Sequence, residues 1–368
     1  MALGLSGSNG GITGDIHPYR VAQGGERSRQ GGPGPVEVSY FVNNVCNLRC
    51  RHCYVGYARQ DNPLTIDQWK GLFDALIGAG ARTFGNVGKE PLLSWRETER
   101  LLMYFCTRRR QLPELRFGLV TNGTMLDDVL ARELARIEPN YIDISLDGDE
   151  RAHDSIRGHG AFARVVSNLA VAVKAGLSSR IFISCTLTSA NADSVGGLAK
   201  VVYDLGIRNL LISPYVSLAE NDPLRLPNDA LRRWAQSLLD GKVVDYNHCS
   251  GMNVYFKSEF ASTRPVMRAL VEDHIIDLDR LLIDRYGVVF CKYEIGGNTV
   301  FFNYQERDDF PSRAIRISHD GYVSNCLSMF YADYPCRAIG NVRHRGILDI
   351  LGDFSSTRPD LQCVGANR

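Results

Sequence analysis

Six strand-like segments alternate with six helix-like segments between residues 36 and 240, and this repeat constrains the fold more than any other feature. The predicted strands are residues 36–42, 82–87, 116–121, 141–146, 180–187 and 209–213, and the predicted helices are 65–77, 95–109, 126–137, 162–175, 193–205 and 228–239. Strands that alternate with helices form a parallel sheet with helices packed outside it. The sequence therefore predicts an α/β fold, either an open sheet or an incomplete barrel, with ligands at the carboxyl ends of the strands.

The segments that flank this repeat have a different character. Residues 1–35 are rich in glycine and predict a flexible tail. Residues 241–286 are irregular, with one helix-like stretch at 267–282, and predict a linker that covers the substrate. Residues 287–368 contain short strand-like runs and turns. They predict a small domain of β-hairpin character, which is too thin to bury a large core and would need a metal or cluster to stabilise it.

Charge and hydropathy exclude several classes of protein. The chain has 42 Lys and Arg residues against 41 Asp and Glu, which argues against a nucleic-acid binder. It has no apolar run long enough to span a membrane and no secretory signal, so we expect a cytoplasmic protein. Its ten cysteines are many for such a protein. In a reducing compartment they indicate metal or cluster ligation rather than disulfides.

Three of these cysteines form the strongest motif in the sequence. Cys46, Cys50 and Cys53 follow the first predicted strand at spacings of four and three residues. Soft thiolates at this spacing indicate an iron–sulfur cluster. A zinc site with His52 as the fourth ligand is the alternative. Three thiolates would leave one iron of a 4Fe–4S cluster free to bind another ligand.

This motif resembles the hallmark of the radical S-adenosylmethionine (SAM) superfamily, and three further motifs extend the resemblance over residues 36–240. They are Gly88-Lys89-Glu90-Pro91, Thr121-Asn122-Gly123, and Ile144–Gly148 followed by His153-Asp154 and Arg157-Gly158. The resemblance implies a partial (β/α)6 barrel in which SAM binds the free iron of a 4Fe–4S cluster. An external one-electron reductant of the flavodoxin or ferredoxin type would then drive its cleavage to a 5′-deoxyadenosyl radical, which abstracts hydrogen from a C–H bond.

The resemblance also implies which residues contact SAM. They are Tyr54, Gly88, Lys89, Glu90, Asn122, Ser145 and Arg157. Ser145 and Arg157 would bind the ribose and the carboxylate, whereas an ion pair between Arg157 and Asp154 is the alternative for that arginine. Lys89 departs from the family pattern, so we expect its side chain to point away from the cofactor or to pair with Glu90.

The carboxyl-terminal segment resembles the SPASM and twitch subgroup of the same superfamily. Gly321-Tyr-Val-Ser-Asn-Cys326 matches the Gly-x-x-x-x-Cys element of that subgroup, and residues 338–342 resemble the turn that follows it. The resemblance implies a twitch-type domain with one auxiliary 4Fe–4S cluster. Its candidate ligands are Cys291, Cys326, Cys336 and Cys363. A disulfide among them is the alternative.

Two other cysteines are candidates for returning hydrogen to a substrate radical. Cys249 lies in a polar loop expected to cover the mouth of the barrel, and Cys185 lies in the fifth predicted strand. An uninvolved loop thiol and an inert core residue are the respective alternatives. Cys106 lies in an amphipathic helix and is expected in the core.

The resemblance points to epimerisation or oxidation at a carbon of a sugar-like small molecule, as in natural-product tailoring. A peptide-modifying SPASM-type maturase is the alternative, disfavoured because residues 1–36 are too short for a domain that binds a leader peptide. A non-catalytic iron–sulfur electron-transfer protein would not need Glu90, Asn122, Ser145 and Arg157 at successive strand ends.

Overall fold

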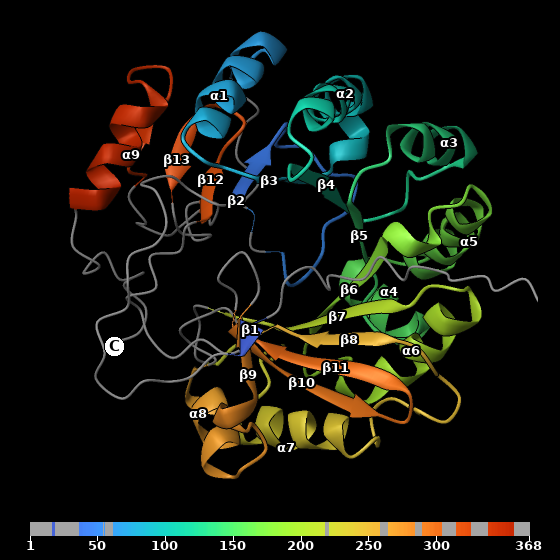
Figure 1. The fold of residues 1–368 in the computed structure, drawn as a ribbon. Coiled ribbons are helices and arrows are strands. Elements are labelled where there is room, and N and C mark those ends of the chain that lie inside the picture. The colour runs from blue at the N-terminus through green and yellow to red at the C-terminus, as the bar shows by residue number, and fades with distance from the viewer. Residues whose placement is uncertain are drawn as a thin grey trace, which may run out of the picture.

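One large sheet forms the centre of the protein, and six parallel strands occupy its middle in chain order (Figure 1). The structure is a computed structural model that describes residues 17–18, 37–53, 55, 62–217, 221–257, 264–283, 289–303, 314–324 and 338–356. The six strands are β2 (Glu37–Phe41), β3 (Thr83–Gly88), β4 (Arg116–Thr121), β5 (Tyr141–Ser145), β6 (Ile181–Leu187) and β7 (Asn209–Pro214). All six predicted strands are therefore confirmed.

Helices follow each of these strands and lie on the outer side of the curved sheet (Figure 1). They are α1 (Ile66–Gly78), α2 (Trp95–Gln111), α3 (Asp128–Ile137), α4 (Glu150–Arg157), α5 (Ala161–Lys174), α6 (Val195–Asp204) and α7 (Asn228–Leu239), with short 3₁₀ turns η1 (Pro91–Ser94), η2 (Ser178–Arg180) and η3 (Ala192–Ser194). The predicted capping box begins α1: Thr65 Oγ1 accepts a hydrogen bond from Gln68 N, and Gln68 Oε1 accepts one from Thr65 N. Helix α4 is an addition that the sequence analysis did not predict.

The two faces of the sheet differ in burial along each strand. In β6, Ile181, Ile183 and Cys185 are buried, whereas Phe182, Ser184 and Thr186 are partly exposed. Successive strand side chains point to opposite faces, so the first set packs toward the outer helices and the second set lies on the inner, concave face. This alternation sorts core residues from residues that can meet a ligand.

The residues after α7 extend the sheet at both of its edges. At one edge, β8 (Asn253–Phe256) pairs in parallel with β7, and the neighbours beyond it are β11 (Asn298–Asn303), β10 (Val289–Ile295), β9 (Leu281–Ile283) and β1 (His17–Pro18). At the other edge, β12 (Ala314–Ile317) pairs in parallel with β2, followed by β13 (Tyr322–Ser324) and β14 (Gly340–Asn341). No pairing closes the ends of the sheet among the described strands, so a partial barrel fits and a closed one does not.

This arrangement does not confirm a separate small domain over residues 287–368. The described strands of that segment join opposite edges of the main sheet, because β10 and β11 lie beyond β8 while β12 and β13 lie beside β2. The helix-like stretch predicted at 267–282 is also shorter than expected. Helix α8 covers Arg264–Glu272, and the chain then passes through a 3₁₀ turn, η5 (Leu278–Arg280), into β9.

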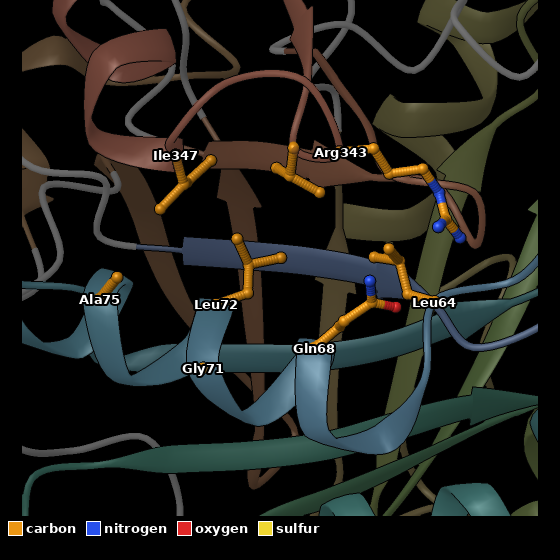
Figure 2. A pocket seen from close by; sticks show the side chains of 8 residues that line it. Leu64, Gln68, Gly71, Leu72, Ala75, Arg343 and Ile347 are labelled. Carbon is orange, nitrogen blue, oxygen red and sulfur yellow. The ribbon is translucent and has the colours of Figure 1, made fainter.

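The last described helix, α9 (Ile347–Ser356), packs beside α1 and covers the β12–β14 edge. A crevice of about 250 Å³ lies between α1 and the segment that leads into α9, and Leu72, Gln68, Arg343 and Ile347 are among the residues that line it. Figure 2 shows these side chains from close by. None of the predicted site residues lines this crevice.

Two glycines on the concave face make room for one large side chain. A Cβ at Gly118 would lie 2.4 Å from the backbone oxygen of Tyr141, and a Cβ at Gly85 would lie 2.5 Å from the Tyr141 hydroxyl. The Tyr141 ring therefore lies across β4 toward β3, in space that only glycine leaves open. In the part of the chain that the structure describes, no helix is both long and apolar enough to cross a membrane.

Candidate active site

The loop of residues 46–53, called the cluster loop below, follows β2 at the carboxyl ends of the parallel strands. Arg51 N donates to Ile156 O at 2.9 Å, which attaches the loop to α4. On the opposite side, Asn122 Nδ2 donates to Asn47 Oδ1 at 2.8 Å and lies 3.7 Å from Cys46 Sγ. The loop is therefore held between the turn after β4 and the helix after β5.

Glu90 connects the ends of β3 and β4. Its side chain is 1% exposed, and its carboxylate accepts hydrogen bonds from Thr121 Oγ1 at 2.7 Å, Asn122 N at 2.8 Å and Leu92 N at 3.0 Å. Burial raises the pKa of Glu90, and these hydrogen bonds act in the opposite direction. Protein donors thus occupy much of the carboxylate, which fixes the turn that carries Asn122.

Gly88 and Lys89 lie beside the cluster loop as the motif predicts. A Cβ at Gly88 would come within 2.5 Å of the Phe41 ring, so this position needs glycine. Lys89 N donates to Asn43 O at 3.0 Å. Burial lowers the pKa of Lys89, while the neighbouring thiols of Cys53 and Cys46 raise it. The Lys89 ammonium therefore interacts electrostatically with the sulfur atoms of the cluster loop.

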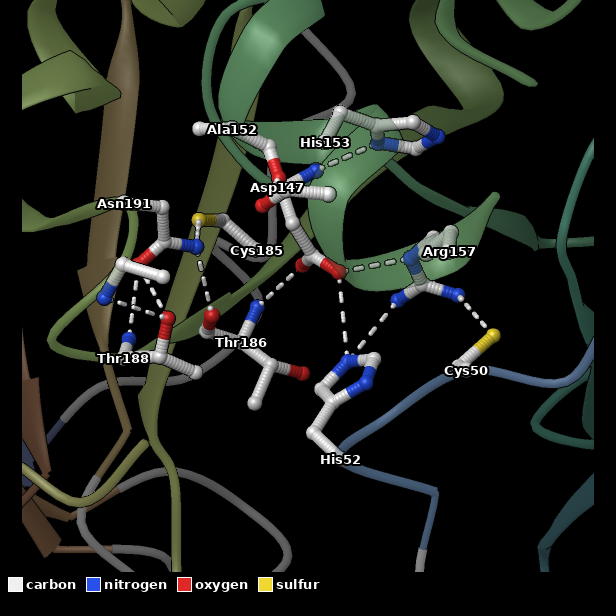
Figure 3. Close-up of polar contacts among 12 residues, drawn as sticks. Cys50, His52, Asp147, Ala152, His153, Arg157, Cys185, Thr186, Thr188 and Asn191 are labelled. Atoms are coloured by element: carbon white, nitrogen blue, oxygen red, sulfur yellow. Dashed lines mark hydrogen bonds and ion pairs between the residues drawn. The ribbon is translucent and has the colours of Figure 1, made fainter. Parts of the chain in front are cut away.

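Asp147 is the centre of a buried charge network on the other side of the loop (Figure 3). Its Oδ2 lies 2.6 Å from Arg157 Nε and 3.2 Å from His52 Nε2, and its Oδ1 accepts from Thr186 N at 2.7 Å. Burial raises the pKa of Asp147, but Arg157 and His52 outweigh it and hold the pKa well below its usual range. Asp147 is therefore a carboxylate at neutral pH.

The ion pair of Arg157 with Asp154, our alternative interpretation of that arginine, is wrong. Arg157 pairs with Asp147, and its Nη1 lies 4.0 Å from Cys50 Sγ. Asp154 instead accepts hydrogen bonds from Gly160 N and Phe162 N, at 2.6 and 2.9 Å. Asp147 belongs to the Ile144–Gly148 motif, but the sequence alone assigned it no role, because no local pattern indicates a pairing with Arg157 ten residues later.

The donor set of the cluster loop suits an iron–sulfur cluster. Cys46 Sγ accepts from Leu48 N at 3.4 Å, and amide or guanidinium groups approach both Cys46 and Cys50, as hydrogen-bond donors do around cluster thiolates. Burial raises the pKa of Cys50 to about 11, although Arg157 acts in the opposite direction. Within the described residues, no three His, Cys, Asp or Glu side chains converge on one metal ion.

Because no three such side chains among the described residues lie around one point, the geometry of the cluster loop does not favour the zinc alternative. A zinc ion needs its ligands around one point, whereas each thiolate of a 4Fe–4S cluster binds a different iron. His52, the fourth ligand of the zinc hypothesis, has its Nε2 engaged with Asp147 and 3.4 Å from Arg157 Nη2. The cluster loop therefore fits a 4Fe–4S cluster better than a single ion.

Ser145 ends β5 on the concave face, in register with Ser184. Tyr54 lies outside the described residues, as do three predicted auxiliary ligands, Cys326, Cys336 and Cys363. Cys291 lies in β10, is fully buried, and its thiol donates to Asp277 O at 3.1 Å. Its role as an auxiliary ligand stays a prediction.

The two proposed hydrogen-donor cysteines are both buried, one near the carboxyl end of β6 beside Asp147 and the other in the loop before β8. Cys185 faces the outer helices, is 1% exposed, and has Asn191 Nδ2 at 3.8 Å from its sulfur. Cys249 is also 1% exposed and precedes β8, and its neighbour His248 contacts Asp204 at the end of α6. Since β8 runs parallel to β7, this loop lies at the amino ends of the strands. The expectation that Cys249 covers the barrel mouth is wrong.

Comparison with known proteins agrees with this geometry. Residues 40–198 match the family model of the Radical SAM superfamily. The chain is 25% identical over 248 residues to Fe-coproporphyrin III synthase of Methanosarcina barkeri, covering 60% of this chain and 58% of the relative. It is 27% identical over 180 residues to the subtilosin biosynthesis protein AlbA of Bacillus subtilis, covering 48% of this chain and 38% of the relative. The chain thus spans about half the length of the curated relatives it matches.

A solved structure shares the fold over most of the chain. The structure of Streptococcus suis SuiB bound to its precursor peptide SuiA has a TM-score of 0.62 and 14% identity, covering 89% of this chain and 68% of that one. The cluster loop and the polar groups around it thus lie within the stretch of the chain that is similar to the Radical SAM superfamily, and the cofactors that this similarity implies are a 4Fe–4S cluster and S-adenosylmethionine.

Proposed function

We propose that this chain is a radical SAM enzyme that abstracts hydrogen from a peptide substrate. The main support for radical SAM activity is the position of the cluster loop, which lies between Asn122 and Arg157 at the carboxyl ends of the strands. When bound, the reduced cluster and SAM supply a 5′-deoxyadenosyl radical. The residues of this chain hold the cluster loop in place and leave the concave face for the substrate.

The concave face presents aligned rows of side chains to that substrate. Ser145, Ser184, Leu211, Tyr255 and Phe301 are register partners across β5, β6, β7, β8 and β11. Hydroxyl groups therefore lie at the β5 end of this row, and aromatic rings lie at the β11 end. A peptide offers both backbone polar groups and apolar side chains, so this mixed row suits it.

A peptide substrate also agrees with the relatives better than a sugar does. SuiB was solved with a precursor peptide, and AlbA serves in bacteriocin biosynthesis. Epimerisation of a sugar-like molecule needs a thiol that can reach the substrate radical, and neither Cys185 nor Cys249 lies on the concave face near the cluster loop. The burial of these two thiols is a second reason to propose a peptide substrate rather than epimerisation of a sugar.

A tetrapyrrole is the second candidate substrate. Tyr255 and Phe301 stack face to face, with ring centroids 4.7 Å apart and an interplanar angle of 6°, so the concave face carries a group of aromatic rings at this end. A planar macrocycle would pack favourably against such rings. Fe-coproporphyrin III synthase among the relatives favours the same class.

The proposal includes one auxiliary 4Fe–4S cluster in the carboxyl-terminal segment and an external flavodoxin- or ferredoxin-type reductant. Cys291, Cys326, Cys336 and Cys363 are its proposed ligands. Replacement of Cys326 by Ala should lower the iron content of reconstituted protein from about eight toward four per chain. An unchanged iron content would remove the auxiliary cluster from the proposal.

Deuterium transfer into 5′-deoxyadenosine tests the substrate class directly. Reconstituted protein with SAM and dithionite would be incubated separately with three deuterated probes: a library of short peptides, coproporphyrin III, and glucosamine. Deuterium from a peptide, and from neither of the others, is the expected result. Deuterium from coproporphyrin III alone would replace the proposal by its second candidate, and deuterium from glucosamine alone would restore the sugar hypothesis.

A further inference from the structure

We propose that Asp147 is a positioning residue that holds Arg157 and His52 against the cluster loop, and thereby retains the cluster. The inference rests on the proposed radical SAM function, but it does not depend on which substrate is used. It assigns a role to a residue outside the cysteine motif and outside the residues that the sequence placed next to the cofactor.

Asp147 connects elements that are distant in sequence. Asp147 follows β5, and its carboxylate reaches the cluster loop through His52, helix α4 through Arg157, and strand β6 through Thr186 N. The Asp147 side chain is fully buried. Its backbone is fixed as well, because Asp147 N donates to His153 Nδ1 at 3.0 Å. Figure 3 shows these contacts converging on one carboxylate.

The Asp147 carboxylate also fixes the orientation of the Arg157 guanidinium. Asp147 takes the Nε edge of the guanidinium at 2.6 Å, which directs the two terminal nitrogens toward the loop. There, Nη1 lies 4.0 Å from Cys50 Sγ and Nη2 lies 3.4 Å from His52 Nε2. A planar guanidinium that is fixed at one edge has little freedom at the other. Asp147 therefore sets where the positive charge lies relative to the Cys50 sulfur.

Loss of the Asp147 carboxylate would leave Arg157 as a buried charge without its partner. The Arg157 side chain is only 10% exposed, so it cannot exchange Asp147 for water without moving. A buried charge that loses its partner is strongly destabilised and moves toward solvent or another partner. In either case the guanidinium leaves its place beside Cys50. Groups that orient metal ligands in this way commonly change metal affinity by about 10- to 100-fold when they are replaced.

The test compares Asp147→Asn with a matched control, Asp154→Asn, in helix α4, which also carries Arg157. Asp154 is also a carboxylate with two short backbone hydrogen bonds, but it contacts the start of α5 and not the cluster loop. Both variants would be reconstituted anaerobically, and the rate of iron release to a chelator would be measured beside the melting temperature of the apo protein. We expect iron release about 10- to 100-fold faster in Asp147→Asn and unchanged in Asp154→Asn.

A double-mutant cycle separates positioning from general damage to the fold. If Asp147 acts mainly through Arg157, then Asp147→Asn combined with Arg157→Gln should release iron no faster than Arg157→Gln alone. Additive effects, or a wild-type rate of iron release in folded Asp147→Asn, would overturn the inference. So would iron release that follows the apo melting temperature across all variants. Wild-type protein that takes up no cluster would instead contradict the proposed function itself.

Discussion

Replacement of Glu90 by Gln tests whether one buried carboxylate holds the ends of β3 and β4 together. The Glu90 carboxylate accepts three hydrogen bonds, two at Oε1 from Thr121 and Leu92 and one at Oε2 from Asn122 N. Gln can keep an oxygen at the first position, but its amide group then meets the Asn122 N–H donor to donor. Asn122 N is thereby left without an acceptor in the protein interior.

The magnitude follows from these contacts. An unsatisfied buried N–H costs about 1–3 kcal/mol, and two charged hydrogen bonds that become neutral lose about 0.5–1.5 kcal/mol each. Removing a buried charge offsets part of this, since burial raises the pKa of Glu90 and so disfavours its ionised form. We therefore expect Glu90→Gln to lower the free energy of unfolding by about 1–3 kcal/mol.

The assay is urea unfolding of the apo protein at pH 7, with Glu99→Gln as the control. Glu99 lies in α2 and forms an exposed ion pair with Arg136 at 3.4 Å, which contributes at most about 1 kcal/mol. Glu90→Gln should also weaken iron retention, because Asn122 contacts Cys46 and Asn47. A variant as stable as wild type to within about 0.5 kcal/mol would refute the reasoning.

Three further predictions concern the cluster, the sheet and pH. Replacing all three cluster-loop cysteines by Ala should remove about four irons per chain and abolish 5′-deoxyadenosine formation, and product in that variant would contradict the site. Gly118→Ala should destabilise the apo protein by about 1–3 kcal/mol, because the new Cβ would lie 2.4 Å from the backbone oxygen of Tyr141. The control, Gly71→Ala in α1, has open space around the new Cβ and should stabilise the protein by up to about 1 kcal/mol. Equal melting temperatures for the two variants would contradict this difference in packing. Burial raises the pKa of Asp143 to about 6, so its contribution to stability is present below pH 3.8 and lost as pH rises through about 6. Asp143→Asn should reduce the change in the free energy of unfolding between pH 3.8 and about 6, measured by urea unfolding. The same pH dependence as in the wild type would contradict the raised pKa of Asp143.

Local sequence patterns determined the repeating part of the fold. Hydrophobic runs of five to seven residues and amphipathic spacing located all six central strands, and the Thr65–Gln68 capping box located the start of α1. These signals are carried by neighbouring residues, so they can be read without knowing what packs against them. The cysteine spacing likewise determined the cluster loop, because one short loop supplies all three thiolates.

The edges of the sheet depended on pairing between distant segments. Strands β10 and β12 look alike in sequence, since both are short apolar runs, yet they join opposite edges. Which edge a short strand joins depends on the free backbone groups that the rest of the fold leaves there. For the same reason, the sequence did not reveal that the loop of Cys249 lies at the amino ends of the strands.

The candidate site also combines features that the sequence determined with features that only the fold determined. The sequence by itself determined the residue types in and around the cluster loop: three thiols, Glu90, Asn122 and Arg157. Only the tertiary structure decided which groups pair, and it gave Arg157 to Asp147 rather than to Asp154, although Asp154 is nearer in sequence. The physical reason is burial. A charge removed from water must find a partner in the same interior, and the fold, rather than sequence distance, decides which partner lies there.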